Sequence, residues 1–385
     1  MGRGLKKRMA MVIGLLLMGL VLVVSGCGGG KDTEKGSSSG NTIKIGEGSP
    51  FTGPVAQVGE VIKKATELAV EQANSAGGIN GKKIEVDYQD DKSDPKEAAI
   101  VANKFAADDT ILATVSHWNS SCLLAASPIL TKAGIPHITF GTSPAITDAG
   151  PFTYRAVATD ASDGQFVAKW TVDEGFKKIA ILWENDDYGK GLGDVYDQKV
   201  KSLGASVVFK EPYNLGETKD FSAILTKLKA ANPDVLFIAG SYNEAAMIMK
   251  QSKRLGINIP VFGSNGLYAD ALVKVGGESV EGLRLVGSFH PSSDFPESKA
   301  FVEAYKAKWG QDPDIWAAFA YDNVNIILSA VKNAGEDRKK INDYLTNLKD
   351  FKGATGITTF DQNGDALKEP LKLIVKDGKF EIYKK

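Results

Sequence analysis

Strand-like and helix-like segments alternate along the chain from about residue 42 onward, and this alternation restricts the fold more than any other feature of the sequence. The series opens with segments of these two kinds over residues 42–47, 55–76, 83–88 and 95–107. Apolar residues recur every three or four positions in the helix-like segments, whereas the strand-like segments are short apolar runs. Such alternation is typical of an α/β protein with a doubly wound parallel sheet, and we predict that class.

A second series of the same kind begins near residue 151, and the length of 385 residues exceeds what one hydrophobic core usually organises. Its helix-like and strand-like segments cover 162–174, 178–183, 190–203, 206–210, 221–231, 234–239, 244–255 and 260–263. Helical patterns over 298–309, 315–334 and 341–348 interrupt the alternation, and we expect them to return to the first lobe. The pattern of residues 355–385 predicts strands around turns at 362–365 and 377–378. The sequence therefore predicts two lobes.

Polar side chains follow two neighbouring strands in the stretch 111–147. Asn119, Ser120 and Ser121, which are residue types that cap helices, stand between the first strand and a helical pattern. The segment 141–144 follows the second strand with two hydroxyls and a proline suited to the first helical position, so a second helix is predicted after it. Both turns would lie at the carboxyl ends of parallel strands, where unpaired backbone N–H groups can hold a small anion such as a carboxylate.

The N-terminus has the features of a secretion signal. Four positive residues within the first eight precede an apolar run over 9–24, and Val24-Ser25-Gly26-Cys27 follows. This arrangement resembles a bacterial lipoprotein signal with its lipobox. The resemblance implies removal of residues 1–26 and a lipid on the Cys27 thiol, which would anchor the protein to the bacterial cell membrane on its extracytoplasmic side, in the periplasm or on the outer face. The alternative is a short transmembrane anchor, but the apolar run falls short of the ~20 residues that a spanning helix needs.

Residues 27–41 are rich in glycine and serine and lack apolar periodicity, so we interpret them as a flexible tether. With Cys27 lipidated, Cys122 is the only other cysteine, and no intrachain disulfide can form. Cys122 falls on the first turn of a helical pattern beside two leucines. We interpret it as a buried structural thiol rather than a reactive one.

Charge and motif content argue against nucleic-acid, metal, cofactor and catalytic functions. Lys+Arg 46 and Asp+Glu 47 give a formal net charge of -1, which offers no electrostatic reason to expect a nucleic-acid partner. His117, His137 and His290 are scattered, and no glycine motif completes Gly-x-Gly-x-x-Gly at a strand-to-helix junction, so neither a metal nor a cofactor is expected. A Ser120–His117 dyad would lack a nucleophile elbow and an evident orienting acid. We therefore interpret His117 as a structural or cleft-lining residue and expect no enzyme.

Short motifs follow one another over nearly all of the chain after the tether. They are Gly53-Pro54-Val55-Ala56-Gln57 with Gly59, Gly77-Gly78-Ile79-Asn80-Gly81, Asp94-Pro95, Tyr188-Gly189, Phe221-Ser222, Leu255-Gly256, Glu281-Gly282, and Thr359-Phe360-Asp361 with Gly364. In this order and spacing they resemble the branched-chain amino-acid binding proteins of ABC importers, the Leu/Ile/Val-binding protein family. The resemblance implies the type I periplasmic-binding fold, in which two Rossmann-like lobes with parallel sheets are joined by a three-segment hinge. It places the N-terminal lobe at 42–158 plus 290–357 and the C-terminal lobe at 159–289 plus 358–385.

The resemblance also implies a ligand site between the lobes. Ser120 matches the serine that binds the ligand carboxylate, and Gly141 and Thr142 match the turn that contacts the carboxylate and the amino group. Tyr188 matches a tyrosine of the second lobe that closes over the ligand. The acids at 186–187 beside it are interpreted as solvated loop residues, because carboxylates would repel a bound carboxylate.

Two positions depart from the family pattern. Asn265 stands where leucine-type binders carry an acid that neutralises the ligand ammonium, and an amide supplies no formal charge. Val58 replaces the aromatic residue that covers the ligand side chain, which opens that end of the pocket. Trp118 and Tyr242 are candidates either to restore an aromatic wall or to belong to the core. Val58, Trp118 and Asn265, together with Asp314, are the candidate positions for setting specificity, and the identity of the ligand stays open.

We therefore predict a monomeric, extracytoplasmic receptor that binds an amino acid of the branched-chain type, or a related small carboxylate or amide, without a cofactor. Hinge closure over the ligand would present it to the membrane permease of an ABC importer. A ligand-sensing receptor or an extracellular hydrolase on the same fold is the alternative.

Overall fold

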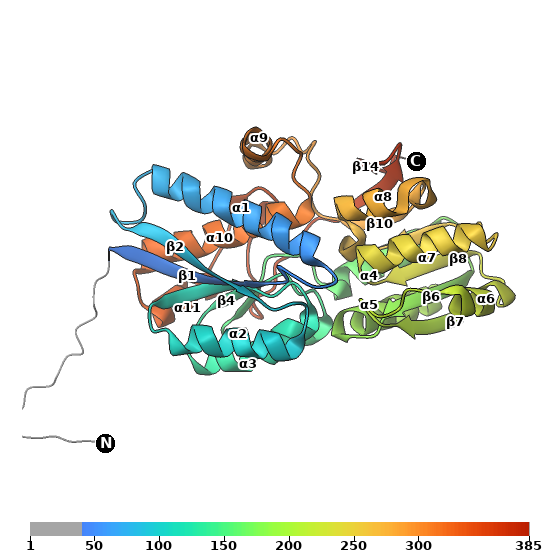
Figure 1. Ribbon diagram of the computed structural model, residues 1–385, viewed down its shortest axis with the longest axis horizontal. Coiled ribbons are helices and arrows are strands. Elements are labelled where there is room, and N and C mark those ends of the chain that lie inside the picture. The colour runs from blue at the N-terminus through green and yellow to red at the C-terminus, as the bar shows by residue number, and fades with distance from the viewer. Residues whose placement is uncertain (1–40, 385) are drawn as a thin grey trace, which may run out of the picture. The chain divides into compact units, whose positions relative to one another are not determined.

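The computed structural model describes residues 41–384, and the strands of this part of the chain form two large sheets and a small hairpin (Figure 1). The predicted signal peptide, Cys27 and all of the tether except its last residue lie outside the described residues. None of the helices within 41–384 is both long and apolar enough to span a bilayer. The predicted α/β class with parallel sheets is confirmed.

The first sheet has five strands in the order β2-β1-β3-β4-β5, and all of its pairings are parallel. Its strands are β1 (Thr42–Ser49), β2 (Lys83–Asp90), β3 (Ile111–Ser116), β4 (His137–Thr139) and β5 (Thr153–Arg155). The helices between them are α1 (Ala56–Ser75), α2 (Pro95–Ala107) and α3 (Ser120–Lys132). Every residue of β3 is buried, as expected for a central strand whose sheet is covered on both faces.

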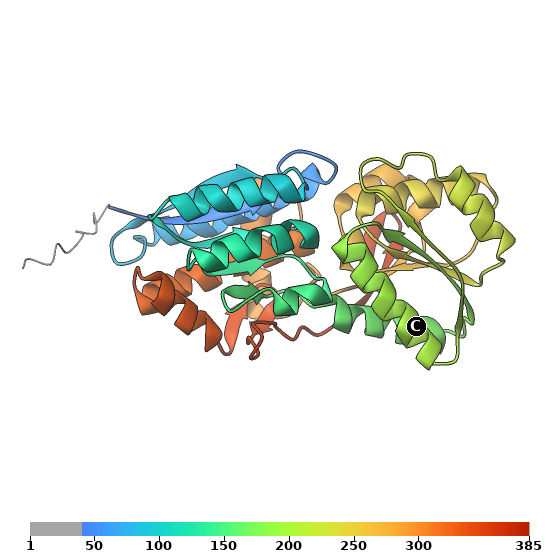
Figure 2. The ribbon, with the colours of Figure 1, turned by 90° about the horizontal axis from the view of Figure 1, so that it is seen from below.

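Helices from late in the chain complete the cover of this first sheet. They are α9 (Pro296–Trp309), α10 (Ile315–Ala334) and α11 (Arg338–Thr346). Helix α10 lies beside α1 on one face, whereas α2 and α3 lie together on the other (Figures 1 and 2). Asp322 of α10 accepts hydrogen bonds from the N–H groups of Ala354 and Thr355, which ties the hairpin of β11 (Phe351–Gly353) and β12 (Gly356–Thr358) to this helix. Because α10 and α11 contact β3, the predicted return of the late helices to the first sheet is confirmed.

The second sheet has seven strands in the order β14-β13-β10-β9-β8-β6-β7. They are β6 (Lys178–Glu184), β7 (Ser206–Tyr213), β8 (Val235–Ala239), β9 (Val261–Gly263), β10 (Arg284–Gly287), β13 (Leu371–Lys376) and β14 (Lys379–Ile382). The associated helices are α4 (Asp160–Asp173), α5 (Asp187–Ser202), α6 (Ser222–Ala230), α7 (Tyr242–Arg254) and α8 (Asp270–Gly276). The strands from β6 to β10 pair in parallel, whereas β13 and β14 form an antiparallel hairpin at the predicted turn of Asp377 and Gly378.

The structure corrects several predicted elements. The second helix predicted after β4 is only a 3-10 turn, Pro144–Asp148, which ends before Gly150 takes a left-handed φ of 122°. Helix α5 begins at Asp187, three residues before its predicted start, because the side chain of Asp186 caps it by accepting from the Gly189 N–H at 2.8 Å. Helix α8 and strand β10 were not predicted, since both are short and lie among polar residues.

The chain passes between the two sheets three times, between β5 and α4, between β10 and α9, and between β12 and β13. Hydrogen bonds also join the elements of the two sheets directly. The Asp187 N–H at the start of α5 donates to Ser121 Oγ at 3.2 Å, and Asn243 Nδ2 donates to the Pro54 carbonyl at 2.6 Å. The N-termini of α5 and α7 therefore lie against the turns that follow β3 and β1.

Candidate functional site

Ser120 connects the two turns that the sequence predicts to bind an anion. It opens α3 directly after β3 and is 1% exposed. Its Oγ accepts hydrogen bonds from the backbone N–H groups of Thr142 and Ser143, each at 3.2 Å. Asn119 holds the N-cap position, but its side chain makes no capping bond. Helix geometry leaves the N–H groups of the first turn of α3 without intrahelical acceptors, so they remain open to an anion beside Ser120.

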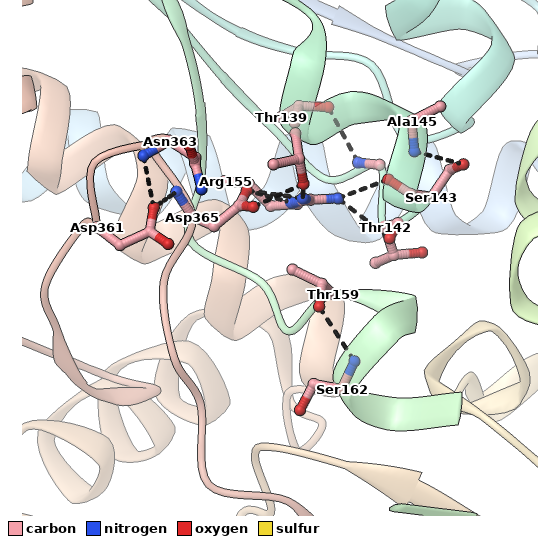
Figure 3. A network of polar contacts seen from close by, with 12 residues as sticks. Thr139, Thr142, Ser143, Ala145, Arg155, Thr159, Ser162, Asp361, Asn363 and Asp365 are labelled. Atoms are coloured by element: carbon pink, nitrogen blue, oxygen red, sulfur yellow. Dashed lines mark hydrogen bonds and ion pairs between the residues drawn. The ribbon is translucent and has the colours of Figure 1, made fainter. Parts of the chain in front are cut away.

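Arg155 holds the second turn from behind (Figure 3). Its guanidinium is fully buried and donates to the carbonyl oxygens of Thr142 at 3.1 Å and Ser143 at 2.8 Å. It also donates to Thr147 Oγ1 at 2.7 Å and, from Nε, to Asp365 Oδ1 at 2.8 Å. Because the donors of a guanidinium form a rigid planar fork, these bonds fix the direction of the turn.

Gly141 leaves the room that this turn needs. A Cβ added at Gly141 would lie 2.6 Å from Ile146 Cδ1 and 3.2 Å from Ser120 Cα. The Gly141 N–H donates to Thr139 Oγ1 at 3.0 Å, so the turn itself uses this backbone group. A side chain at position 141 would push the two turns apart.

Two buried acids lie next to the same turn. The Asp160 N–H donates to the Thr142 carbonyl at 2.9 Å, and the Asp160 carboxylate is fully buried and forms no ion pair within residues 41–384. Burial, and then the neighbouring Asp163, raises the pKa of Asp160 well above its ordinary value, although the Thr142 hydroxyl lowers it in part. Asp163 accepts a hydrogen bond from Asn265 Nδ2 at 3.0 Å, and burial raises the pKa of Asp163 to about 7. The other polar atom of this side chain, Asn265 Oδ1, is buried and has no partner among residues 41–384.

Tyr188 reaches the same region from α5. Its hydroxyl lies 3.0 Å from Ser264 Oγ, and the residue is 7% exposed. Burial, followed by the charge of Asp160, raises the pKa of Tyr188 above its ordinary value. A Cβ added at Gly266 would lie 2.3 Å from the Tyr188 hydroxyl oxygen, so a glycine is required opposite the tyrosine.

The candidate aromatic wall is also buried. Trp118, Tyr242 and Val58 are 6%, 1% and 1% exposed. Trp118 makes an edge-to-face contact with Trp316 of α10, with the ring centroids 5.2 Å apart. Within the part of the chain that the structure describes, the buried indole N–H groups of Trp118 and Trp316 and the buried Tyr242 hydroxyl have no hydrogen-bond partner. The structure thus adds Trp316, which the sequence reading missed, to the residues that surround the site.

Three further interpretations are tested by the structure. Asp186 caps α5, and burial raises its pKa to about 6, so its interpretation as a solvated loop acid was wrong, whereas Asp187 is exposed. An acid does orient His117, because Asp91 Oδ2 lies 2.7 Å from His117 Nδ1 and both side chains are fully buried. The Ser120 hydroxyl nevertheless bonds to the second turn and not to this histidine. Cys122 is a buried free cysteine whose pKa burial raises, as the structural interpretation expects.

The family model described as periplasmic binding protein matches residues 42–375. The chain belongs to the periplasmic binding protein family. A leucine-, isoleucine-, valine-, threonine-, and alanine-binding protein of Pseudomonas aeruginosa is 34% identical over 336 residues, which are 86% of this chain and 88% of that protein.

Solved structures agree with this assignment. The leucine-binding protein LivK of Thermotoga maritima has a TM-score of 0.84 at 31% identity and covers 89% of this binding protein and 98% of its own chain. The branched-chain amino acid transporter substrate-binding protein LivJ of Streptococcus pneumoniae, in complex with isoleucine, has a TM-score of 0.83 at 32% identity, with coverages of 88% and 98%. The resemblance seen in the sequence and the type I periplasmic-binding fold are both confirmed.

Family membership also separates the alternatives. The family consists of extracytoplasmic solute-binding proteins and not of enzymes, so the hydrolase alternative is not supported. The buried Ser120, His117 and Asp91 therefore serve structure or binding.

The sequence reading missed Arg155, Asp160 and Asp163. A signal was present for the first, since Arg155 is a lone charge at the end of an apolar strand. The two aspartates resemble the acids that commonly favour the first turn of a helix, here α4 after its Thr159 cap, and only burial distinguishes them from such residues.

Proposed function

We propose that this binding protein is the receptor of an ABC importer and that it holds one free amino acid between two lobes. One observation carries the proposal: the turn that we propose binds an anion shares a residue with a buried acid that forms no ion pair within residues 41–384. The Thr142 N–H donates to Ser120 Oγ, and the Thr142 carbonyl accepts from the N–H of Asp160. An α-amino acid carries its carboxylate and its ammonium on one carbon, so a single small ligand matches both features.

The residue roles follow from charge. The ligand carboxylate takes hydrogen bonds from Ser120 and from the first N–H groups of α3, with Gly141 and Thr142 on its other side. The ligand ammonium pairs with Asp160, because a buried carboxylate without a cation is costly. Asn265 Oδ1 accepts a second bond from the ammonium. On this assignment Asp160 supplies the formal charge that Asn265 lacks.

Closure over the ligand would be the transport signal. We assign the lobes to 42–158 plus 290–357 and to 159–289 plus 358–385, with Tyr188, Tyr242 and Trp118 around the ligand. On this proposal, the bonds from Asp187 to Ser121 and from Asn243 to Pro54 would help to hold the closed form. A ligand that touches both lobes stabilises only this form and so shifts the population toward it. The closed monomer, anchored through Cys27 after removal of residues 1–26, would then engage the membrane permease.

The relatives support an amino acid as the ligand. One is named for leucine, isoleucine, valine, threonine and alanine, and another was solved with isoleucine. Thermal unfolding with a panel of amino acids tests the proposal, because saturation at a hundred times the dissociation constant stabilises by about 2.7 kcal/mol. The amide and the des-amino analogue of each hit serve as matched controls and should shift the midpoint less. A panel in which no amino acid moves the midpoint would refute the proposal.

A further inference from the structure

A cavity of about 130 Å³ lies beside Val58, the position where the resemblance led us to expect an aromatic cover. Residues of α1, of α8 and of the segment that leads from α9 into α10 line it. Among them are Asp270, Lys274, Tyr305 and Asp314. The cavity is large enough for a few non-hydrogen atoms, since one water needs roughly 10–15 Å³ of such space.

One ring contact and two short stretches of sequence relate the carboxylate turn to this cavity. Trp118 precedes Ser120 by two residues and contacts Trp316 edge to face at 5.2 Å. Trp316 follows Asp314 by two residues at the start of α10. Burial, and to a smaller extent the charge of Asp314, raises the pKa of Tyr242, which belongs to the candidate wall. Val58 lines the cavity and also holds the position that the resemblance places beside the ligand side chain, so we take the cavity as the distal end of the proposed site.

The lining of the cavity holds more acids than lysines. Its acids are Glu60, Asp270, Asp312 and Asp314, and its lysines are Lys64 and Lys274. Glu60 pairs with Lys64 at 2.6 Å, and Asp312 pairs with Lys306 from outside the lining at 2.9 Å. Two acids, Asp270 and Asp314, are then left with one lysine, Lys274.

A neutral polar group without a partner faces the same space. The Tyr305 hydroxyl is fully buried and lines the cavity near Gln311, and it makes no hydrogen bond of normal geometry within residues 41–384. An aliphatic side chain placed here would cover this hydroxyl and the Asp314 carboxylate without bonding to either, which is unfavourable. A group with N–H or O–H donors would satisfy the carboxylate.

Asp314 is held in a defined orientation. Its Oδ1 accepts from the Ala317 N–H at 2.9 Å, which makes Asp314 the N-cap of α10, and the residue is 9% exposed. Because one oxygen is used for the cap, the carboxylate cannot rotate freely. The second oxygen is the one that can serve a ligand.

We infer that the ligand is an amino acid whose side chain ends in a hydrogen-bond donor, and that Asp314 receives this donor in the cavity beside Val58. The inference rests on the proposed function and narrows it to hydroxyl, amide or ammonium side chains. A purely aliphatic amino acid is then a poorer ligand than a polar one of the same size.

Calorimetric titration of the wild type with three matched pairs tests this inference: lysine with norleucine, glutamine with methionine, and threonine with valine. The polar member of at least one pair should bind at least tenfold more tightly than its apolar partner. The variant Asp314→Asn keeps the helix cap, because asparagine caps as well as aspartate, but turns an N–H₂ group toward the ligand. It should remove that preference, whereas the control Asp312→Asn, at an acid already paired with Lys306, should keep it.

The outcomes distinguish a failure of this inference from a failure of the proposed function. Apolar members that bind as tightly as their polar partners in every pair would overturn the inference while leaving the proposed function intact. A polar preference that survives in Asp314→Asn would overturn the role of Asp314. If neither these six compounds nor any other amino acid binds, the proposed function fails and the inference fails with it.

Discussion

At the carboxylate end of the proposed site, polar groups of separate elements bond to one another, whereas at its distal end two buried polar groups form no hydrogen bond within residues 41–384. Ser120, Thr142 and Arg155 form a connected set of hydrogen bonds, all from elements of the first sheet. At the distal end, the Trp316 indole and the Tyr305 hydroxyl are buried without partners. The first end is a rigid part of the fold, and the second is assembled from side chains of separate elements. A substitution at the distal end should therefore change the ligand and spare the fold.

Arg155→Met should produce the largest effect, at the rigid end. It leaves Asp365 and two carbonyl oxygens without their buried cation, and breaking a buried ion pair in this way costs about 3–5 kcal/mol. Denaturant unfolding measures this loss. Arg254→Met, at an exposed arginine, is the control and should change the free energy of unfolding by less than ~0.5 kcal/mol. If Arg155→Met lowered the free energy of unfolding by less than ~1 kcal/mol, the hydrogen bonds of Arg155 would not hold this end of the site rigid.

Asp160→Asn should weaken ligand binding without lowering the stability of the ligand-free protein. Loss of a charged partner to the ligand ammonium costs about 1.5–3 kcal/mol, which is roughly a 10- to 150-fold rise in the dissociation constant. The ligand-free protein should not lose stability, because the substitution removes a buried carboxylate that lacks a cation. Titration calorimetry and thermal unfolding measure the two quantities. Asp187→Asn, at an exposed acid of the same region, should leave both unchanged.

Ser120→Ala should have a smaller effect at the same end. It removes a hydroxyl that accepts from two backbone N–H groups, and we expect a loss of roughly 1–3 kcal/mol in binding with the fold intact. Affinity by calorimetry and the melting midpoint check this result. The exposed Ser202→Ala is the control. An unchanged affinity would move the ligand carboxylate away from Ser120.

Glu47 of β1 is a buried acid to which we assign no role at either end of the site. It therefore serves as a reference for the buried acids within the site. Burial raises its pKa to about 8, so the folded protein binds the proton more tightly than the unfolded chain. Its contribution makes the free energy of unfolding fall as pH rises from the ordinary range of a glutamate through about 8. Glu47→Gln should flatten this dependence and melt higher than the wild type above pH 8. The ligand should not change that difference, and a ligand-dependent difference would place Glu47 within the site.

Part of this architecture could be predicted from the sequence. Helical spacing and short apolar runs predict the doubly wound class, and capping residue types predict the turn at Ser120. The buried charges could not be predicted, since Asp160 and Asp163 look like ordinary first-turn acids until the fold buries them. The contact between Trp118 and Trp316 could not be predicted either, because almost two hundred residues separate them in the chain. Sequence patterns of neighbouring residues predict helices, strands and turns. The site, however, depends on contacts between segments that are far apart in the sequence.

The affinity of an amino acid and of its des-amino analogue, measured on the wild type and on Asp160→Asn, tests the central claim most directly. If Asp160 pairs with the ligand ammonium, removal of the amino group should weaken binding to the wild type at least tenfold. The same removal should change binding to Asp160→Asn far less, because the interaction is already lost. An equal loss in both proteins would show that the ammonium lies elsewhere and would contradict the account.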